Sequence, residues 1–443
     1  MWFLDDELAP IVPIRPRPAP ERAEAVAAYA LPAPRSRVRT ALSSPALMHF
    51  NRLIALAVLG NVVLAVELGG TLSAVTLSHL VLGNFAVGIV IRQQYVVNLL
   101  FWIATRAPTS WPLAIRATCG KVYHFGGIHV GCMIAGTAWY LAFVVELVGQ
   151  PATPAVLAVV IAQLAILLGI TVMSLPRIRA QHHDTFERVK RFGGWTSLAL
   201  FWLQTALLLD APLLTAPEIW VLALITTSVA LPWLRLKKVP VELVVPSKHV
   251  ALARFDHGET PFAGSSTAIS RSPLLEWHSF ANVPTPGQPG FRLTISRAGD
   301  WTGRLIDDRP THVWVKGITT AGVANIEVLF KKVVYIATGS GIGPCLPHLL
   351  AQQVPAKLIW ATRDPRATYG DGLVDEILAA HPDALIWDTH KQGKPDMVKL
   401  AHRACIETGA EAVICISNKA LTWQVVTGLE SRGIPAYGAI WDS

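Results

Sequence analysis

Long apolar runs in the first half of the chain constrain its fold more than any other feature. A helix needs about 20 apolar residues to cross a hydrocarbon core. Six runs approach this length: Leu53–Gly70, Leu72–Ile91, Phe125–Val148, Ala155–Leu175, Gly193–Leu209 and Ile219–Leu234. The stretch Tyr95–Ala104 is apolar but too short to span, which favours an interfacial or re-entrant segment. The mean hydropathy of +0.42 is unusual for a soluble protein. The sequence therefore predicts a six-helix transmembrane bundle.

Lys and Arg residues lie on only one side of this predicted bundle. They cluster before the first run, between the second and third, between the fourth and fifth, and after the sixth, whereas the alternate loops have none. Because cytoplasmic loops retain positive charge, both the N-terminus and the chain after the sixth run are expected in the cytosol. The formal charge of +8 follows from this orientation. We therefore expect a lipid bilayer as partner and no nucleic acid.

The first 48 residues resemble a disordered cytosolic tail. They contain seven prolines between Pro10 and Pro34 and no compact apolar segment like that of a cleaved signal peptide. The five cysteines of the chain show no paired motif, so we expect neither disulfide bonds nor a metal site.

The composition changes after Lys238. Short β-like runs separated by Pro and Gly clusters predict a small antiparallel β-barrel; they are Val239–Val245, His249–Phe255, Phe291–Ile295 and His312–Val315. Apolar strands then alternate with helical stretches, which predicts a parallel sheet covered by helices; the strands are Val333–Thr338, Leu358–Ala361, Ala384–Trp387 and Ala412–Ile416. We place the tail at 1–48, the transmembrane domain at 49–236, the barrel at 237–331 and the α/β domain at 332–443.

A glycine-rich turn follows the first strand of the α/β domain. Glycines allow a backbone to approach phosphate oxygens, and a helix that opens behind them directs free N–H groups toward an anion. The candidate pyrophosphate-binding residues are Thr338, Gly339, Ser340, Gly341, Gly343 and Pro344. A tight turn that binds nothing is the alternative, since a lone glycine cluster is a weak signal.

A basic segment follows the second strand, where the adenosine half of a dinucleotide lies in such folds. Arg363 and Arg366 suit a 2′-phosphate, which favours NADPH over NADH, and Tyr369 is placed to stack on adenine. Thr362 closes the strand beside them. The alternative is a solvated basic loop.

Three motifs in fixed order carry a resemblance to a known family. They are Trp277–Ala281, Gly299–Thr302 and Gly339–Pro344. Together they resemble the ferredoxin-NADP reductase superfamily, in its membrane branch of ferric reductases and NADPH oxidases. Within that branch the chain is most similar to fungal TmpA-type integral membrane flavoproteins and to the related membrane regions of some adenylate-forming reductases. The likeness extends from about Arg52 to Ser443.

The resemblance implies an FAD site in the barrel. Trp277, His278, Ser279 and Phe280 correspond to a segment that grips the flavin, although Ala281 stands where the family has a threonine. The flavin pyrophosphate would contact a turn made of Gly299, Asp300, Trp301 and Thr302, with a hydrogen bond from Thr302. Trp441 resembles the terminal aromatic residue that covers the flavin and moves aside for nicotinamide. An ordinary barrel strand, a β-turn and a packing tryptophan are the respective alternatives.

Histidine spacing argues against haem. Ferric reductases hold haems with histidine pairs about 13 to 14 residues apart on two helices, whereas His124 and His129 are five apart and His182 and His183 are adjacent. We therefore expect FAD and NADPH but no haem. The histidines on the cytosolic side are also candidates to contact a quinone-like or lipid-like acceptor.

The sequence thus predicts a flavin oxidoreductase that passes electrons from cytosolic NADPH through FAD to an unknown small-molecule acceptor near the membrane, with a role in secondary metabolism or developmental signalling. A non-catalytic membrane sensor or scaffold that keeps a degenerate nucleotide-binding domain is the alternative, because Ala281 lacks the expected hydroxyl. The sequence does not predict an oligomeric state.

Overall fold

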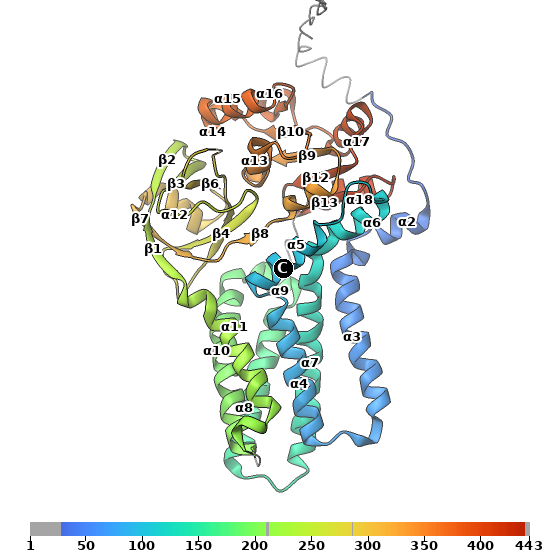
Figure 1. Ribbon diagram of the computed structural model, residues 1–443, viewed down its shortest axis with the longest axis vertical. Helices are drawn as coiled ribbons and strands as arrows, with labels where there is room; N and C mark the ends of the chain where they lie inside the picture. The colour runs from blue at the N-terminus through green and yellow to red at the C-terminus, as the bar shows by residue number, and fades with distance from the viewer. Residues whose placement is uncertain (1–27, 210–211, 286, 439–443) are drawn as a thin grey trace, which may run out of the picture.

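A computed structural model describes residues 28–209, 212–285 and 287–438. Long helices form a bundle at one end of the molecule, and a β-barrel and an α/β domain lie side by side at the other end (Figure 1). The chain enters the barrel directly from the last long helix and passes from the barrel into the α/β domain.

All regular secondary structure in the described part of the chain before residue 236 is helical. The long ones are α3 (His49–Leu68), α4 (Ala74–Val90), α7 (Gly126–Val148), α8 (Pro154–Met173), α10 (His183–Leu208) and α11 (Pro217–Leu234). Shorter elements are α2 (Arg37–Leu42), η1 (Pro45–Leu47), η2 (Gly69–Thr71), α5 (Gln94–Ala104), α6 (Leu113–Cys119), η3 (Gly120–Phe125), α9 (Pro176–Gln181) and η4 (Leu213–Thr215).

Glycine residues set the closest approach within the bundle. An added Cβ at Gly127 would lie 2.2 Å from the carbonyl oxygen of Phe50, and one at Gly131 would lie 2.9 Å from that of Ile54. Helices α3 and α7 therefore pack backbone against backbone, which small residues allow.

Each of the six predicted apolar runs lies in a long helix, but fewer helices meet the requirements of a membrane span. By length and composition, four stretches of the described chain qualify: His49–Leu68, Leu113–Val148, Pro154–Met173 and Pro217–Leu234. Helices α4 and α5 qualify only together, and they are bent by 68° at the break between them. This bend places Tyr95–Ala104 in the separate short helix α5, and its interfacial or re-entrant position stays a prediction.

The barrel consists of two antiparallel sheets. Its elements are β1 (Leu236–Pro240), β2 (Glu242–Ser247), β3 (Val250–Phe255), β4 (Ser265–Ser270), β5 (His278–Ala281), β6 (Phe291–Ser296), α12 (Asp300–Asp308), β7 (His312–Lys316) and β8 (Thr320–Ala321). One sheet has the order β1-β7-β4-β5, with β8 paired to β4, and the other has the order β2-β3-β6. The predicted strands correspond to β1–β2, β3, β6 and β7, whereas β4, β5 and β8 lie outside them.

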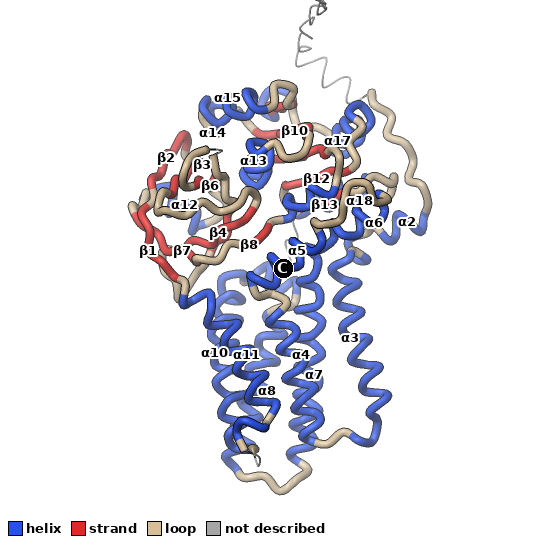
Figure 2. Tube along the Cα trace, in the orientation of Figure 1, coloured by secondary structure: helices blue, strands red, loops and turns tan. Residues whose placement is uncertain are grey.

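The α/β domain has a parallel sheet of order β11-β10-β9-β12-β13 with helices around it (Figure 2). Its strands are β9 (Val333–Thr338), β10 (Ala356–Thr362), β11 (Leu385–Asp388), β12 (Ala412–Ile416) and β13 (Ala436–Gly438). Its helical elements are η5 (Val323–Leu329), η6 (Gly339–Gly341), α13 (Ile342–Ala351), α14 (Pro365–Tyr369), α15 (Asp371–Ala380), α16 (Thr389–Gln392), α17 (Met397–Thr408) and α18 (Lys419–Glu430). The strand order reverses between β9 and β12, where doubly wound folds bind their ligands.

The helical region and the α/β domain share one core. Phe101, Ala107 and Val122 are buried in the same cluster as Tyr335 and Trp360 of the sheet. Arg116 of α6 also reaches into this interface, where its guanidinium donates hydrogen bonds to both carboxylate oxygens of Glu411 at 2.7 and 3.1 Å.

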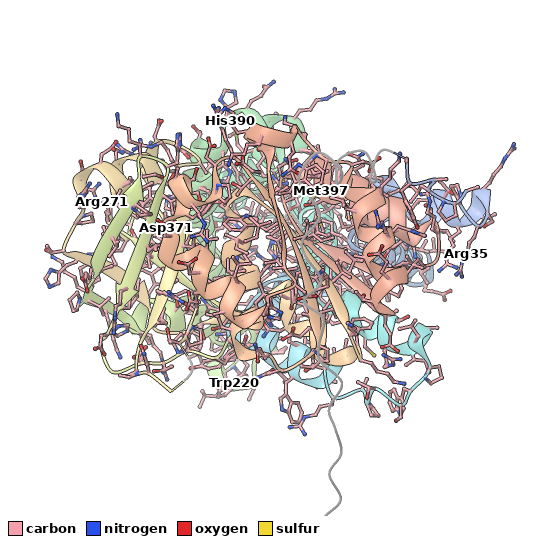
Figure 3. All side chains as sticks on the ribbon, turned by 90° about the horizontal axis from the view of Figure 1, so that it is seen from above. Arg35, Trp220, Arg271, Asp371, His390 and Met397 are labelled. Atoms are coloured by element: carbon pink, nitrogen blue, oxygen red, sulfur yellow. The ribbon has the colours of Figure 1, made fainter. Side chains whose placement is uncertain are left out.

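The first described residues pass along the outer side of the α/β domain. The amide of Arg35 donates a hydrogen bond to the carbonyl of Ser431, and Arg39 donates one to the carbonyl of Glu430. Seen from above, Arg35 lies on the side of the sheet opposite Arg271 of the barrel (Figure 3). The sheet is thus flanked by the barrel and by the start of the described chain.

Candidate functional site

The predicted glycine turn lies at the carboxyl end of β9, where it forms η6 and leads into α13. Gly339 has a φ of +50°, in the left-handed region that favours glycine. An added Cβ at Gly341 would lie 2.0 Å from the carbonyl oxygen of Ile416. Only glycine therefore lets the turn pass so close to the end of β12.

The other residues of this turn have different exposures. Ser340 is exposed, Thr338 and Pro344 are half-buried, and Gly343 is buried. The hydroxyls of Thr338 and Ser417 share a hydrogen bond across the ends of β9 and β12. The sequence prediction of the site did not include Ser417, although its position just after a predicted strand could have indicated it.

In the basic segment after β10, one of the two arginines already binds neighbouring carboxylates. Arg366 donates hydrogen bonds to Asp371 at 2.9 Å and to Asp375 at 2.7 Å, and these bonds raise the pKa of its guanidinium. Asp371 lies between the barrel and the sheet in Figure 3. Arg363, by contrast, keeps 75% of its side chain exposed, with Asp364 at 3.5 Å. Arg363 is therefore the freer of the two predicted phosphate ligands.

Tyr369 does not present a free ring for adenine. It is 3% exposed and packs edge-on against Trp360, with ring centroids 4.9 Å apart. Thr362 is buried next to it at the end of β10. A stack on adenine requires Tyr369 to move first, so this role stays a prediction that the present conformation does not support.

The predicted flavin-gripping segment forms strand β5 and the residue before it. His278 stacks on Trp301 with centroids 4.0 Å apart, and Phe280 lies over the same ring at 6.3 Å. Burial lowers the pKa of His278, and its buried Nε2 atom has no hydrogen-bond partner among the described residues. Ser279 is exposed. The strand thus offers one unpaired polar atom and one free hydroxyl.

Trp277 lies beside a perturbed lysine. The ammonium of Lys316 lies 4.6 Å from the centre of the Trp277 ring. Burial, followed by the nearby Arg191 and Lys190, lowers the pKa of Lys316 to about 8. No sequence pattern distinguishes Lys316, because the shift of its pKa depends on residues distant in the chain.

The turn Gly299–Thr302 forms the start of α12. Gly299 and Asp300 are exposed, and an added Cβ at Gly299 would meet nothing within 4 Å among the described residues. The Thr302 hydroxyl accepts hydrogen bonds from the amides of Ala298 and Gly299 and donates one to the Gly299 carbonyl at 3.1 Å. The prediction that Thr302 donates to a pyrophosphate therefore conflicts with this capping role. Free backbone N–H groups of α12 remain the better anion donors.

The fold brings the barrel and α/β motifs against each other. Helix α13 packs against β5 and β6, and η6 contacts β6. An added Cβ at Gly343 would lie 3.3 Å from Thr294 of β6. The hydroxyl of Ser247 in β2 donates a hydrogen bond of 2.7 Å to the carbonyl of Thr368. The glycine turn and the flavin-gripping strand thus face one interface.

The described residues contain no group of three or more His, Cys, Asp or Glu side chains that could hold a metal ion. Of the histidines considered for haem, His129 uses Nδ1 in a hydrogen bond with the Gly88 carbonyl at 2.8 Å. Trp441 lies outside the described residues, so its predicted role over the flavin stays a prediction.

Comparison with known proteins gives partial matches. The family model for the C-terminal domain of adenylate-forming reductase 03009 matches residues 323–443. Adenylate-forming reductase 06235 of Coprinopsis cinerea is 45% identical over 382 residues, which are 83% of this chain and 37% of the relative. Adenylate-forming reductase 03009 of the same fungus is 45% identical over 379 residues, 82% of this chain and 37% of the relative. The chain thus spans only 37% of the length of these relatives.

Solved structures with weaker likeness include two ferredoxin-NADP+ reductases. One, from Neisseria gonorrhoeae with bound FAD and NADP, is 14% identical with a TM-score of 0.36 and covers 46% of this chain and 98% of that one. The other, from Plasmodium falciparum with 2′P-AMP, is 10% identical with a TM-score of 0.38 and covers 46% and 95%. By sequence, the chain is similar to a region of fungal adenylate-forming reductases.

Proposed function

We propose that this chain is a membrane-anchored flavin oxidoreductase that passes electrons from NADPH through FAD to a small-molecule acceptor near the membrane. One observation carries the proposal: the glycine turn at the reversal point of the α/β sheet packs, through η6 and α13, against β5 and β6 of the barrel. A dinucleotide bound at that turn would extend toward the flavin-gripping strand. Similarity to proteins named reductases supports the same class of reaction.

Several residues around the two turns fit the two cofactors. Gly299 and Gly339 leave room beside the backbone, the nearest atom to an added Cβ at Gly339 being the Tyr369 hydroxyl at 3.8 Å. The unpaired Nε2 of His278 would hold the flavin side, and Arg363 the 2′-phosphate. When bound, NADPH would donate a hydride and FAD would accept it and pass the electrons on, while the protein would supply binding, orientation and exclusion of water.

Membrane anchoring is supported by the helical bundle. Its four candidate spans lie on one side of the molecule, with the barrel and the α/β domain together on the other. The Lys and Arg residues that precede α3 and follow α11 lie at the same end as these domains, as a cytosolic location of the domains requires. We propose that the N-terminus and the reductase domain face the cytosol.

A non-catalytic sensor is the second candidate, and specific contacts favour it. Ala281 offers no hydroxyl, Thr302 uses its hydroxyl in the cap of α12, and Arg366 is held by two carboxylates. A chain that binds NADPH without flavin would have kept the α/β turn while losing the barrel site.

The visible absorption spectrum of the detergent-purified chain, loaded with FAD and then reduced anaerobically with NADPH, separates the two. Flavin bands that bleach with NADPH support the oxidoreductase. A protein that releases all FAD on gel filtration but melts at a higher temperature with NADPH is a sensor. A sharp Soret band would contradict our expectation about haem.

A further inference from the structure

A pocket lined by several charged side chains among apolar ones lies between the bundle and the far side of the α/β domain, away from the glycine turn. It is formed where α2, the start of α3 and η3 meet α18, and it consists of an outer hollow of about 500 Å³ and an inner one of about 50 Å³. We call it the junction pocket. The residues that decide its chemistry are Arg39, His49, Arg52, Lys121, His124 and Glu430.

A buried histidine lines the inner hollow without a partner. His124 is 6% exposed, and its Nδ1 atom makes no hydrogen bond within the described part of the chain. Its ring lies 4.2 Å from that of Tyr123 and 5.7 Å from that of His49. Buried polar atoms in native structures nearly always have a partner. A molecule bound in the hollow would supply such a partner once the His124 ring turns its buried Nδ1 toward it.

Positive charge exceeds negative charge around the pocket. Lys121 forms an ion pair with Glu430, which leaves Arg39 and Arg52 uncompensated there. Arg52 uses Nε and Nη2 on the carbonyls of Leu47 and Leu42 at 2.7 and 2.6 Å. Its Nη1 makes no hydrogen bond within residues 28–209, 212–285 and 287–438. A fixed guanidinium with a free N–H edge selects an acceptor anion.

The pocket opens at the end of a helix with an apolar surface. His49 and Arg52 lie in the first turn of α3, a candidate span. Further along the same helix, Leu56, Leu59 and Val66 are exposed. Basic pockets at the cytosolic ends of membrane helices suit acidic lipid head groups. A lipid whose anionic head group lies in the junction pocket can therefore place its acyl chain along α3.

We propose that the junction pocket binds a phosphate group, supplied either by an acidic phospholipid or by a free phosphate. Arg39 and Arg52 balance its charge, and His124 supplies the hydrogen bond that now has no partner. Binding at this pocket requires neither FAD nor NADPH, so loss of the flavin reaction leaves it untouched.

The test uses the full chain in an uncharged detergent. Thermal melting is followed during titration with three probes: inorganic phosphate, dihexanoyl phosphatidic acid and dihexanoyl phosphatidylcholine. We expect phosphatidic acid to raise the melting temperature and phosphatidylcholine not to. Arg52→Gln should weaken the binding about tenfold, the size expected for one charge-assisted hydrogen bond, and His124→Phe should weaken it as well. Arg254→Gln, an exposed residue of β3, is the charge-matched control and should change nothing.

The outcomes separate the sources. Binding of both inorganic phosphate and phosphatidic acid shows that an uncompensated phosphate group suffices, whereas binding of phosphatidic acid alone assigns the site to a lipid, and equal binding of phosphatidylcholine contradicts selection by charge. If neither probe stabilises the protein, or if Arg52→Gln and Arg254→Gln weaken binding equally, the proposal is wrong. It is also wrong if Gly341→Ala abolishes the binding and Arg52→Gln does not, because the phosphate then sits at the nucleotide turn. Arg52→Gln decides the matter even if His124→Phe does not fold.

Discussion

The side-chain hydroxyls of Thr338 and Ser417 share a hydrogen bond where the neighbouring strands β9 and β12 end. This hydrogen bond lies where the strand order of the sheet reverses, next to the glycine turn. The turn thus rests on two paired strands whose backbone ladder this side-chain hydrogen bond extends at its end. Substitutions at this pair should therefore affect the candidate nucleotide site.

Gly341→Ala tests the close approach of this turn. Its Cβ would lie 2.0 Å from a backbone carbonyl oxygen, which cannot move aside as a side chain can. We expect a loss of about 2 kcal/mol in the free energy of unfolding and a large rise in the KM for NADPH. Gly372→Ala is the matched control, since its Cβ meets nothing within 4 Å among the described residues. Equal behaviour of the two variants would contradict the role of the turn.

Arg363 and Arg366 should differ in their effect on coenzyme preference. Arg363 is exposed and free to turn, whereas Arg366 is held by Asp371 and Asp375. Arg363→Gln should lower kcat/KM for NADPH about tenfold, as expected for loss of one charged hydrogen bond, and leave NADH unaffected. Arg366→Gln should have a smaller effect. The ratio of kcat/KM for the two coenzymes is the measurement, and a larger effect at Arg366 would reverse our assignment.

Lys316 should make stability depend on alkaline pH. Burial lowers its pKa to about 8 in the folded protein, below the ordinary value of 10.5. Between these two values the unfolded chain binds more protons, so the free energy of unfolding rises with pH. Lys316→Met removes a charge that is costly to bury, and a shift of this size corresponds to about 3 kcal/mol. The variant should melt at a higher temperature at pH 7, and the difference should shrink toward pH 10. A difference that is the same at both pH values would argue against a buried charge.

The two partners of the Arg116–Glu411 ion pair should differ in how much stability is lost when each is replaced. The side chain of Arg116 is 4% exposed and that of Glu411 is 20% exposed. Glu411→Gln leaves a buried cation without its anion and should cost about 3 kcal/mol in the free energy of unfolding. Arg116→Gln leaves a more solvated carboxylate and should cost less. Denaturant unfolding of both single variants and of the double variant measures the coupling.

The surface pair Arg403–Glu407 is the control for this prediction, and Glu407→Gln should cost less than about 0.5 kcal/mol. The stability that the Arg116–Glu411 pair contributes should also depend on pH. The hydrogen bond from Arg116 lowers the pKa of Glu411, so the stabilisation is present above the ordinary carboxyl pKa of 4.5 and is lost as the pH falls. Equal losses in Glu411→Gln and Glu407→Gln would contradict the importance of the interface.

The central α/β strands were predictable because their apolar runs are unbroken. Strands β9 and β12 are buried on both faces, which leaves a continuous apolar signal. Strand β4 consists largely of Ser and Thr, and its place in the barrel depends on pairing with β5 and β7. No local sequence pattern predicts a strand of that kind.

The candidate site was predictable as motifs but not as contacts. The spacing of glycines and arginines indicated a phosphate turn and a basic segment. The burial of Tyr369, the bonds of Thr302 and the orphaned Nε2 of His278 result from tertiary packing. The junction pocket combines His49, His124 and Glu430 from distant segments, so sequence alone could not assemble it.

The shared core limits how the molecule can move. Phe101, Ala107 and Val122 of the helical region belong to the same buried cluster as the strands of the α/β domain. That domain cannot tilt on the bundle without exposing its own interior to water, which costs free energy in proportion to the apolar area. The barrel joins the bundle covalently at the passage from α11 to β1 and also through side chains, since Asn98 of α5 donates a hydrogen bond to the Thr319 carbonyl and Arg191 of α10 donates one to the Leu274 carbonyl. Val250 and Val283 of the barrel belong to the same buried cluster. An opening between the two upper domains would therefore expose apolar surface whichever of them moved, so bundle, barrel and α/β domain form one mechanical unit.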